Sequence, residues 1–201
     1  MPVIEEDIQL KQTLITKLTE QYSKQKDGLF VTDFTYCLRK AYWRRINPKP
    51  LTEKTLGYFV DGNRRHETLQ CLDGFRSEVS IQKYGLRGRL DMLGDYPIEM
   101  KSTRSGSQYG VSPHYQKQCV IYALMTGQST VCLLVQHINE SVFKFHKLTF
   151  TQEELRLAEE TLLKEIDALR NALALKDPKD LPYPEPWECN FCDHKGDCYH
   201  P

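Results

Sequence analysis

The sequence lacks several features that would assign a chain to a broad class at once. None of its apolar runs approaches the roughly 20 residues of a membrane-spanning helix, and its first residues lack the apolar core of a secretory signal. Lys and Arg together number 27, as do Asp and Glu, so the net charge is zero and no overall basic field indicates a nucleic-acid partner. We therefore expect a soluble cytoplasmic protein in which local patches hold any nucleic acid.

The seven cysteines are an odd number in a chain without an evident export signal. This favours a reducing compartment, with metal or thiol roles, over a disulfide framework. Three of the cysteines, Cys71, Cys119 and Cys132, stand among apolar residues of predicted helices or strands and are expected to be core thiols.

The order of predicted elements indicates an α/β domain with a mixed sheet. Ser112 and Pro113 begin one helix that Gly127 ends, and Thr151 with Glu154 forms a capping box for a long helix that ends near Leu175. In chain order we predict an N-terminal amphipathic helix, helices at 34–46 and 53–72, strands at 78–83, 86–93 and 97–102, a helix at 113–125, strands at 129–138 and 141–150, and a helix at 152–175.

Three segments follow from this order. We expect an N-terminal amphipathic helix in 1–30, a core in 31–176, and in 177–201 a Pro-rich stretch that runs extended to a cysteine tail.

The segment from Leu86 to Ser102 carries charges that a core hairpin does not need. Residues two apart in a strand share a face, so Glu99 and Lys101 project together, and a three-residue turn at 94–96 would place Asp91 opposite Glu99. Adjacent carboxylates repel unless a cation or a shared proton lies between them, and such oxygen ligands suit magnesium or manganese. With Lys101 on the same face, the pattern predicts phosphodiester hydrolysis. An isolated pattern of this kind more often marks a surface ion pair.

Two helices carry further polar candidates. His66 lies in the helix upstream and could complete a metal shell, although a lone histidine is more often structural. His114, Gln118 and Tyr122 are spaced four residues apart, which places them on one helix face. That face fits the lining of a polar site and a partly exposed helix equally well.

The tail contains a strong metal signal. Cys189, Cys192 and Cys198 form a C-x2-C-x5-C pattern, and a tetrahedral site or a cubane cluster needs a fourth ligand. Cys37 is our choice, because its surroundings are polar and lie outside the predicted sheet. His194 and His200 are rivals for this place, and either one would favour zinc.

A ligand at position 37 would bring the segment "LRKAYWRR" close to the cluster. The segment interleaves cations with aromatic rings, which suits single-stranded nucleic acid. The same pattern is equally typical of an amphipathic helix with a basic outer face. The candidate DNA-binding residues are Arg39, Lys40, Tyr42, Trp43, Arg44, Arg45 and His114.

Taken together, these motifs resemble the RecB-like branch of the PD-(D/E)xK nucleases, and most closely the CRISPR-associated exonucleases that carry an iron-sulfur cluster. The resemblance spans about Asp33 to Cys198. It rests on Gly62-x-x-x-His66, Gly88-Arg89-Leu90-Asp91, Ile98-Glu99-Met100-Lys101, Gln118-x-x-x-Tyr122, and Cys37 with the cysteine tail. It implies a restriction-endonuclease-like core with a central mixed sheet flanked by helices, and an iron-sulfur clasp that joins the two ends.

The resemblance also implies a role for each motif. His66, Asp91, Glu99 and the Met100 carbonyl would bind Mn²⁺ or Mg²⁺, Lys101 would be the catalytic lysine, and Gln118 and Tyr122 would position the DNA or that lysine. The clasp of Cys37, Cys189, Cys192 and Cys198 would hold a structural 4Fe-4S cluster. The family trims single DNA strands, commonly from the 5′ end, and prepares spacers for CRISPR arrays with integrase partners.

Two other functions stay open at this stage. One is a non-catalytic nucleic-acid-binding adaptor with a zinc site, and the other is a nuclease subunit of a DNA-repair helicase complex. Against the second, the chain has no G-x-x-x-x-G-K-[ST] loop and no room for a motor. The N-terminal helix has no part in the motifs and suits homo-oligomerisation or docking of a partner.

Overall fold

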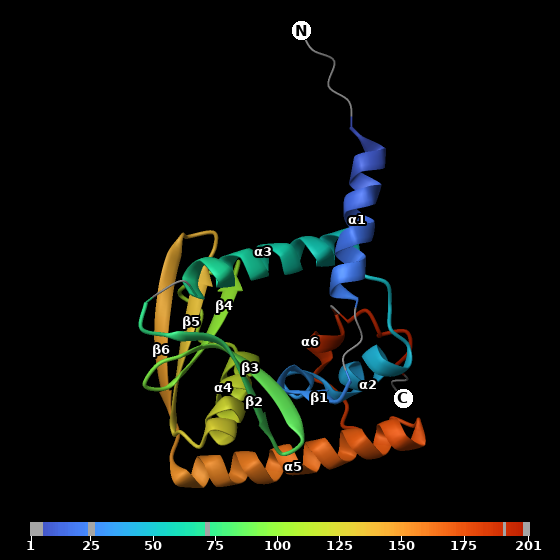
Figure 1. Ribbon diagram of the computed structural model, residues 1–201. Coiled ribbons are helices and arrows are strands. Elements are labelled where there is room, and N and C mark those ends of the chain that lie inside the picture. Colours follow the sequence, from blue (N-terminus) through green and yellow to red (C-terminus); the bar gives the residue numbers. More distant parts are fainter. Residues whose placement is uncertain (1–5, 24–26, 71–72, 191, 199–201) are drawn as a thin grey trace.

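Strand β3 (Leu86–Leu93) organises a six-stranded mixed sheet in the computed structural model of this chain, as Figure 1 shows. The structure describes residues 6–23, 27–70, 73–190 and 192–198. The other strands are β1 (Leu29–Phe30), β2 (Arg76–Lys83), β4 (Pro97–Thr103), β5 (Thr130–His137) and β6 (Val142–Thr149). The order is β1-β3-β4-β5-β6, with β2 paired to β3. The predicted mixed α/β sheet is confirmed, although the two-residue β1 was missed.

The strands divide at β3. Antiparallel β2 pairs along the whole of β3, and β1 and β4 pair at its opposite ends. β1 pairs at Leu86 and Arg87, whereas β4 pairs only at Met92 and Leu93. β4 then runs parallel to β5 over its full length. Residues 88–91 of β3 therefore lie between two separate ladders, and this opening is called the fork below.

The register prediction for this hairpin is right at the turn and wrong beyond it. Leu93 pairs with Pro97 as predicted, but the ladder stops after Met92 and Ile98. Asp91 is not a ladder partner of Glu99, because its side chain accepts a hydrogen bond from the Met100 backbone N–H at 2.7 Å.

Helices cover both sides of the sheet. α4 (Pro113–Thr126) lies between the strands and the long α5 (Gln152–Leu175), and α3 (Glu53–Gln70) crosses near the far ends of β4 and β5 (Figure 1). Gly127 ends α4 with a φ of +72°, and Thr151 and Glu154 form the capping box of α5, both as expected. Ser112 stands at the N-cap position of α4, but its side chain makes no capping hydrogen bond. The last two residues of the predicted helix at 53–72, which include Cys71, lie outside the described part of the chain.

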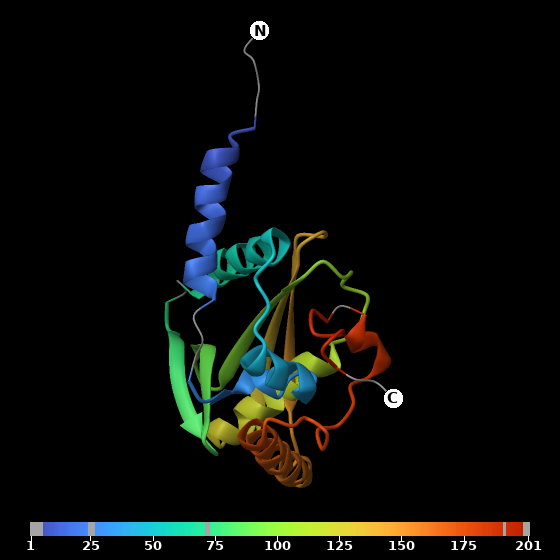
Figure 2. The same cartoon turned by 90° about the vertical axis from the view of Figure 1, so that its right-hand side faces the viewer.

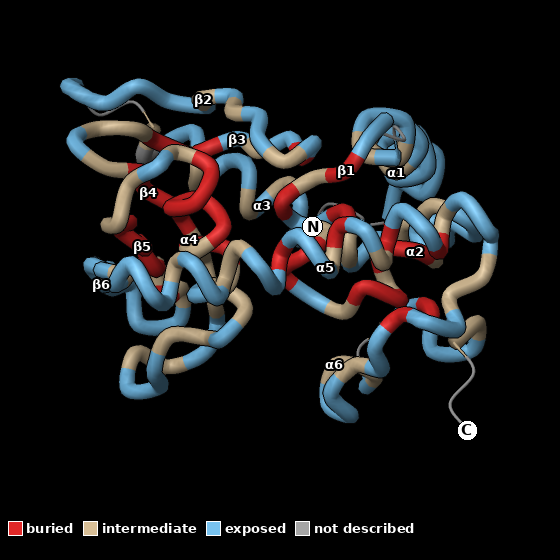
Figure 3. Tube along the Cα trace, turned by 90° about the horizontal axis from the view of Figure 1, so that it is seen from below, coloured by how far each residue is buried: buried red, intermediate tan, exposed pale blue. Residues whose placement is uncertain are grey.

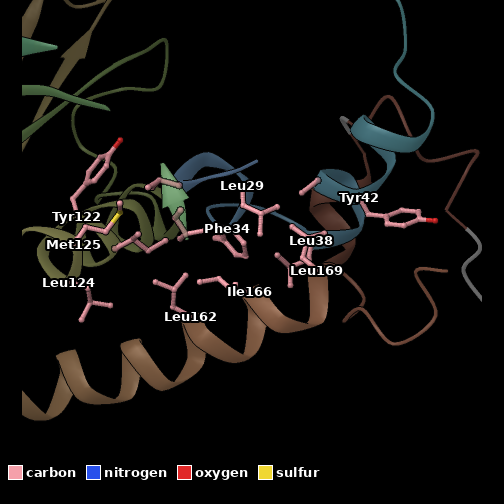
Figure 4. Close-up of a cluster of buried hydrophobic side chains, with 14 of the residues drawn as sticks. Leu29, Phe34, Leu38, Tyr42, Tyr122, Leu124, Met125, Leu162, Ile166 and Leu169 are labelled. Carbon is pink, nitrogen blue, oxygen red and sulfur yellow. The ribbon is translucent and has the colours of Figure 1, made fainter. Parts of the chain in front are cut away.

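The main core lies where α5 meets α4, α2 and the segment around β1. Figure 4 shows Leu162, Ile166 and Leu169 of α5 directed toward Phe34 and Leu38. A second cluster joins α4 to β5 through Cys119, Ala123 and Leu133, and Figure 3 shows these buried segments in red. Cys119 and Cys132 are buried, as predicted for core thiols.

The second predicted helix starts later than expected. Val31–Asp33 form a 3-10 turn (η1), and α2 covers Leu38–Ile46 with Cys37 as its N-cap. The Asp33 carboxylate accepts from Phe30 N at 2.7 Å and pairs with Arg45 of α2. The cysteine at position 37 therefore stands at the start of a helix instead of within one.

The Pro-rich segment runs without regular structure from 177 to 185, as expected, but then forms the short helix α6 (Pro186–Cys189), which was not predicted. Pro186 occupies the first turn of α6, where its missing N–H costs nothing. The segment is held against α2 by Arg39, which donates to the carbonyls of Leu181 and Lys179 at 3.0 Å each.

Helix α1 (Ile8–Tyr22) extends away from the rest of the chain (Figures 1 and 2). None of its residues is buried, and Ile8 is 72% exposed. It contacts α3 through Tyr22, whose ring lies 5.4 Å from that of Phe59 and whose hydroxyl accepts from Asn63. Among the described helices, none is both long enough and apolar enough to span a bilayer. The division of the chain at 30 and 176 stays a prediction.

Gly88 at the fork leads to a testable prediction. A Cβ there would lie 3.0 Å from Tyr122 Cε1 and from Val31 Cγ2, both in buried side chains. We expect Gly88→Ala to lower the free energy of unfolding by about 1–3 kcal/mol, measured by urea denaturation, because the core must shift to admit the methyl group. Gly57→Ala is the matched control, since a Cβ there meets nothing within 4 Å. Because alanine favours a helix over glycine, this variant should raise the free energy of unfolding by about 0.5–1 kcal/mol. An unchanged stability for Gly88→Ala would contradict this view of the fork.

Candidate active site

Asp91 stands at the end of the fork and joins three elements. Its Oδ2 accepts from Met100 N, and its Oδ1 lies 3.2 Å from His66 Nδ1 of α3. The Gln70 amide also donates to the Asp91 backbone carbonyl at 3.3 Å. The carboxylate thus fixes the middle of β4 relative to β3 and keeps one oxygen toward the helix that carries His66.

Glu99 is the most deeply buried carboxylate of the site, with 2% of its surface exposed. Its Oε1 accepts a short hydrogen bond from Lys101 Nζ, and its Oε2 is buried without a hydrogen-bond partner among the described residues. Burial, assisted by the charge on Asp91 and opposed by Lys101 and His66, raises the pKa of Glu99 to about 7. Asp91, Glu99, Lys101 and His66 are therefore within electrostatic reach of one another.

The raised pKa of Glu99 predicts a pH-dependent stability in the protein kept in chelator. The folded state holds the proton more tightly than the unfolded chain, whose glutamate has a pKa of 4.5. The stabilisation is therefore complete below that value and is lost as the pH rises through about 7. We expect Tm to fall across this window in the wild type and to fall much less in Glu99→Gln, as measured by thermal melts. Equal slopes in the two proteins would contradict the burial of this proton.

Lys101 remains a cation in this environment. Burial lowers the pKa of its ammonium group, but the charge and hydrogen bond of Glu99 outweigh burial, so the pKa is raised. The ammonium group also lies 5.9 Å from the centre of the Tyr115 ring. A protonated lysine suits electrostatic stabilisation of a phosphate better than removal of a proton from water. Tyr115 was not among the site residues predicted from the sequence, in which its position next to His114 was the only signal for it.

Gln118 and Tyr122 lie behind the fork. Gln118 Nε2 donates to Tyr122 Oη at 3.4 Å, and the Tyr122 hydroxyl donates to the Arg89 carbonyl at 3.0 Å. Burial, with the charge of Glu99 as a further cause, raises the pKa of Tyr122, which keeps the phenol protonated. This pair therefore holds the β3 backbone between its two ladders.

The side chains at the fork are of the chemical kinds that would bind a hard divalent cation. The carboxylates of Asp91 and Glu99 and the imidazole of His66 supply oxygen and nitrogen ligands, and Glu99 Oε2 is a buried acceptor that lacks a donor. No group of three or more His, Cys, Asp or Glu side chains in the described part of the chain is arranged to hold a metal ion as it stands. Metal binding at the fork would therefore require these side chains to rearrange.

The cysteine tail lies beside the start of α2. Burial raises the pKa of Cys37, the backbone N–H groups of Lys40 and Arg39 oppose the rise, and the charges of Glu188 and Cys198 add to it. Burial, then Cys192 and Cys198, raise the pKa of Cys189. Asp197 ties the tail to the loop after α2 by an ion pair with Lys49 at 2.8 Å. The four thiols suit an iron-sulfur cluster in kind, but in the part of the chain that the structure describes they are not arranged as a metal site.

The two histidines that were alternatives to Cys37 as the fourth ligand, His194 and His200, differ in what the structure describes of them. His194 is 3% exposed, and its Nδ1 lies 3.0 Å from Asp197 Oδ2, so this ring nitrogen already has a partner within the tail. His200 lies outside the described residues.

The predicted DNA-binding surface on α2 is wrong for its central residues. Arg39 is buried, bonded to the Pro-rich segment and stacked at 3.9 Å on Tyr183, and Tyr42 is 1% exposed in the core. Arg45 is paired with Asp33. Trp43 and Lys40 are half-buried, and Arg44 is exposed.

His114 does not face the fork. Its Nδ1 lies 2.9 Å from the Thr35 carbonyl, and its ring stacks between Tyr36 and Trp187, so it joins α4 to α6. The predicted helix face is thus divided: His114 lies against α6, whereas Gln118 and Tyr122 contact each other and β3.

No protein-family model and no curated protein match this chain, but solved structures do. It aligns with the crystal structure of SSO0001 at 17% identity and a TM-score of 0.67, covering 94% of this chain and 95% of that one. It also aligns with LHK-Exo in complex with dAMP at 12% identity and a TM-score of 0.50, covering 83% and 95%. LHK-Exo is an alkaline exonuclease from Laribacter hongkongensis, and a second structure of it matches at 14% identity and 0.48 over 69% and 78%. The likenesses to SSO0001 and to LHK-Exo with dAMP show a shared fold.

Proposed function

We propose that this chain is a divalent-metal-dependent DNA exonuclease of the PD-(D/E)xK type. The observation that carries the proposal is the buried Glu99, which has one unpartnered oxygen and lies within electrostatic reach of Asp91, His66 and Lys101 at the fork. A surface ion pair would not bury its carboxylate at 2% exposure. The shared fold with LHK-Exo, an exonuclease crystallised with dAMP, supports the same class.

Asp91, Glu99, His66 and the Met100 carbonyl would hold Mn²⁺ or Mg²⁺, which would neutralise phosphate charge and lower the pKa of water at the scissile bond. Asp91 also fixes the Met100 backbone through its hydrogen bond to N. Lys101, kept cationic by Glu99, lies where it can stabilise charge on the phosphate. Gln118 and Tyr122 hold the β3 carbonyl of Arg89 and act as positioning residues.

We further propose that Cys37, Cys189, Cys192 and Cys198 hold a structural 4Fe-4S cluster. The proposal is supported by position: Cys37 at the start of α2 lies within electrostatic reach of Cys198, and Asp197 ties the tail to Lys49 just after α2. By its resemblance to the CRISPR-associated exonucleases, the chain would trim single strands from the 5′ end and work with an integrase complex, as a monomer or homo-oligomer.

The experiment is degradation of single-stranded DNA labelled at either its 5′ or its 3′ end, with manganese or with chelator. The proposal expects manganese-dependent products and immediate release of one label, the 5′ label for 5′ to 3′ action. Intact DNA in all lanes with metal-loaded protein would overturn it and would favour the adaptor.

A further inference from the structure

A pocket of about 310 Å³ lies between α3 and the ends of β5 and β6, and it is called the α3–β6 pocket here. Its lining residues are Asp61, Arg64, Arg65, Thr68, Gln136 and Phe143. Two guanidinium groups, a hydroxyl, an amide and an exposed aromatic ring thus meet in one depression, with a single carboxylate against the two cations.

The pocket adjoins the candidate active site along two elements. On α3, Arg65 directly precedes His66, whose ring faces Asp91. On the sheet, Gln136 pairs with Ser102, the residue after Lys101. Neighbouring residues of a strand face opposite sides of the sheet, so Gln136 points to the face opposite Lys101. The pocket and Lys101 therefore lie on opposite faces, and the C-terminal ends of β4 and β5 separate them.

The cations of this pocket have spare hydrogen-bonding capacity. Arg65 Nε is buried without a hydrogen-bond partner in the described part of the chain, and Arg65 Nη1 makes only a 3.5 Å contact with Gln136 Oε1. Arg64 is exposed. Guanidinium donors arranged in a fork match the oxygens of a phosphodiester. This differs from α2, where Arg39 and Arg45 are already engaged by the protein.

The aromatic side chains continue the same surface along β6. Phe143 is 45% exposed, and Phe145, two residues further and on the same face, is 67% exposed. Lys147 follows on this face and lies 5.5 Å from the ring of Tyr96. Exposed rings beside cations suit a single-stranded nucleic acid, because unpaired bases stack on the rings while cations hold the phosphates.

We infer that the α3–β6 pocket binds a single DNA strand, with phosphates at Arg64 and Arg65 and a base stacked on Phe143. The inference deepens the proposed nuclease function and rests on it for the identity of the strand. A second copy of the chain pairing with edge strand β6 is the competing occupant. The two guanidinium groups favour a polyanion over an apolar partner.

The test measures binding without cleavage. A fluorescent oligo(dT) is titrated with the full chain in chelator, and the anisotropy is followed at several salt concentrations. We expect Phe143→Ala and Phe143→Leu each to weaken binding by at least about fivefold, since leucine keeps apolar volume but removes the ring. Arg64→Ala should weaken binding and reduce the slope of log K against log salt by about 0.7. Arg156→Ala on α5 is the matched control, with unchanged affinity expected, because this exposed arginine pairs with Glu153 and Glu160 and lines neither the pocket nor the fork.

Three results would overturn the inference: wild-type affinity in all pocket variants, full affinity in Phe143→Leu, or a loss in Arg156→Ala as large as that in Arg64→Ala. Light scattering that shows self-association, lost in Phe143→Ala while DNA binding persists, would assign the surface to a second copy. The two proposals fail separately. Pocket-dependent binding without any cleavage would support the inference against the nuclease, and metal-dependent cleavage with pocket-independent binding would do the reverse.

Discussion

Asp91→Asn is expected to lower manganese-dependent DNA cleavage by about 10²–10³-fold while the chain stays folded. The amide oxygen of asparagine can still accept from Met100 N, so the junction of β3 and β4 is kept. What is lost is a negative charge beside Glu99 and His66, at the place where the cation would bind. The measurements are the cleavage rate at saturating manganese and the Mn²⁺ affinity by titration calorimetry.

The matched control for this prediction is Asp95→Asn in the neighbouring turn, where the carboxylate is exposed. It should leave both the cleavage rate and the Mn²⁺ affinity at wild-type values. Wild-type cleavage by a folded Asp91→Asn protein would place the chemistry elsewhere.

Cys198→Ser is expected to abolish the visible absorbance and iron content of the anaerobically purified protein. The clasp would join α2 to the extreme C-terminal segment, and closing so long a loop restricts the unfolded chain strongly. We expect the free energy of unfolding to fall by about 2–5 kcal/mol, the range seen when a native covalent cross-link is removed. Iron analysis and denaturant unfolding measure the two effects.

Cys132→Ala is the control for the cluster, because Cys132 is a buried thiol of the sheet core. It should retain full iron content although it loses some packing. Zinc in place of iron in the wild type, with His194 needed to hold it, would replace the cluster by the zinc site.

The sequence predicted the elements whose signals are local. The caps of α4 and α5 were visible as Ser112, Gly127 and the Thr151–Glu154 box, and each helix ends within about one residue of its predicted limit. The turn that pairs Leu93 with Pro97 was equally local. The fork was not, because it depends on β4 leaving β3 to pair with β5, a contact between segments far apart in the chain.

The basic helix α2 shows why charge patterns alone misplace a binding surface. The sequence does not distinguish Arg39 and Arg45 from cations that are available for a ligand. In the structure, Arg39 is bonded to the Pro-rich segment and Arg45 is paired with Asp33. Conversely, Arg64, Gln136 and Phe143 come from three elements, and only the fold brings them to one pocket. Long-range partners decide which cations remain available.

The most direct test of the nuclease at the fork compares wild type with Lys101→Ala on end-labelled single-stranded DNA in manganese, with binding measured in chelator. The ammonium group of Lys101 is the positive charge beside Glu99. Removing this group should lower the cleavage rate by about 10²–10³-fold and leave DNA binding largely unchanged. Cleavage by Lys101→Ala at the wild-type rate would contradict the assignment of the fork as the active site.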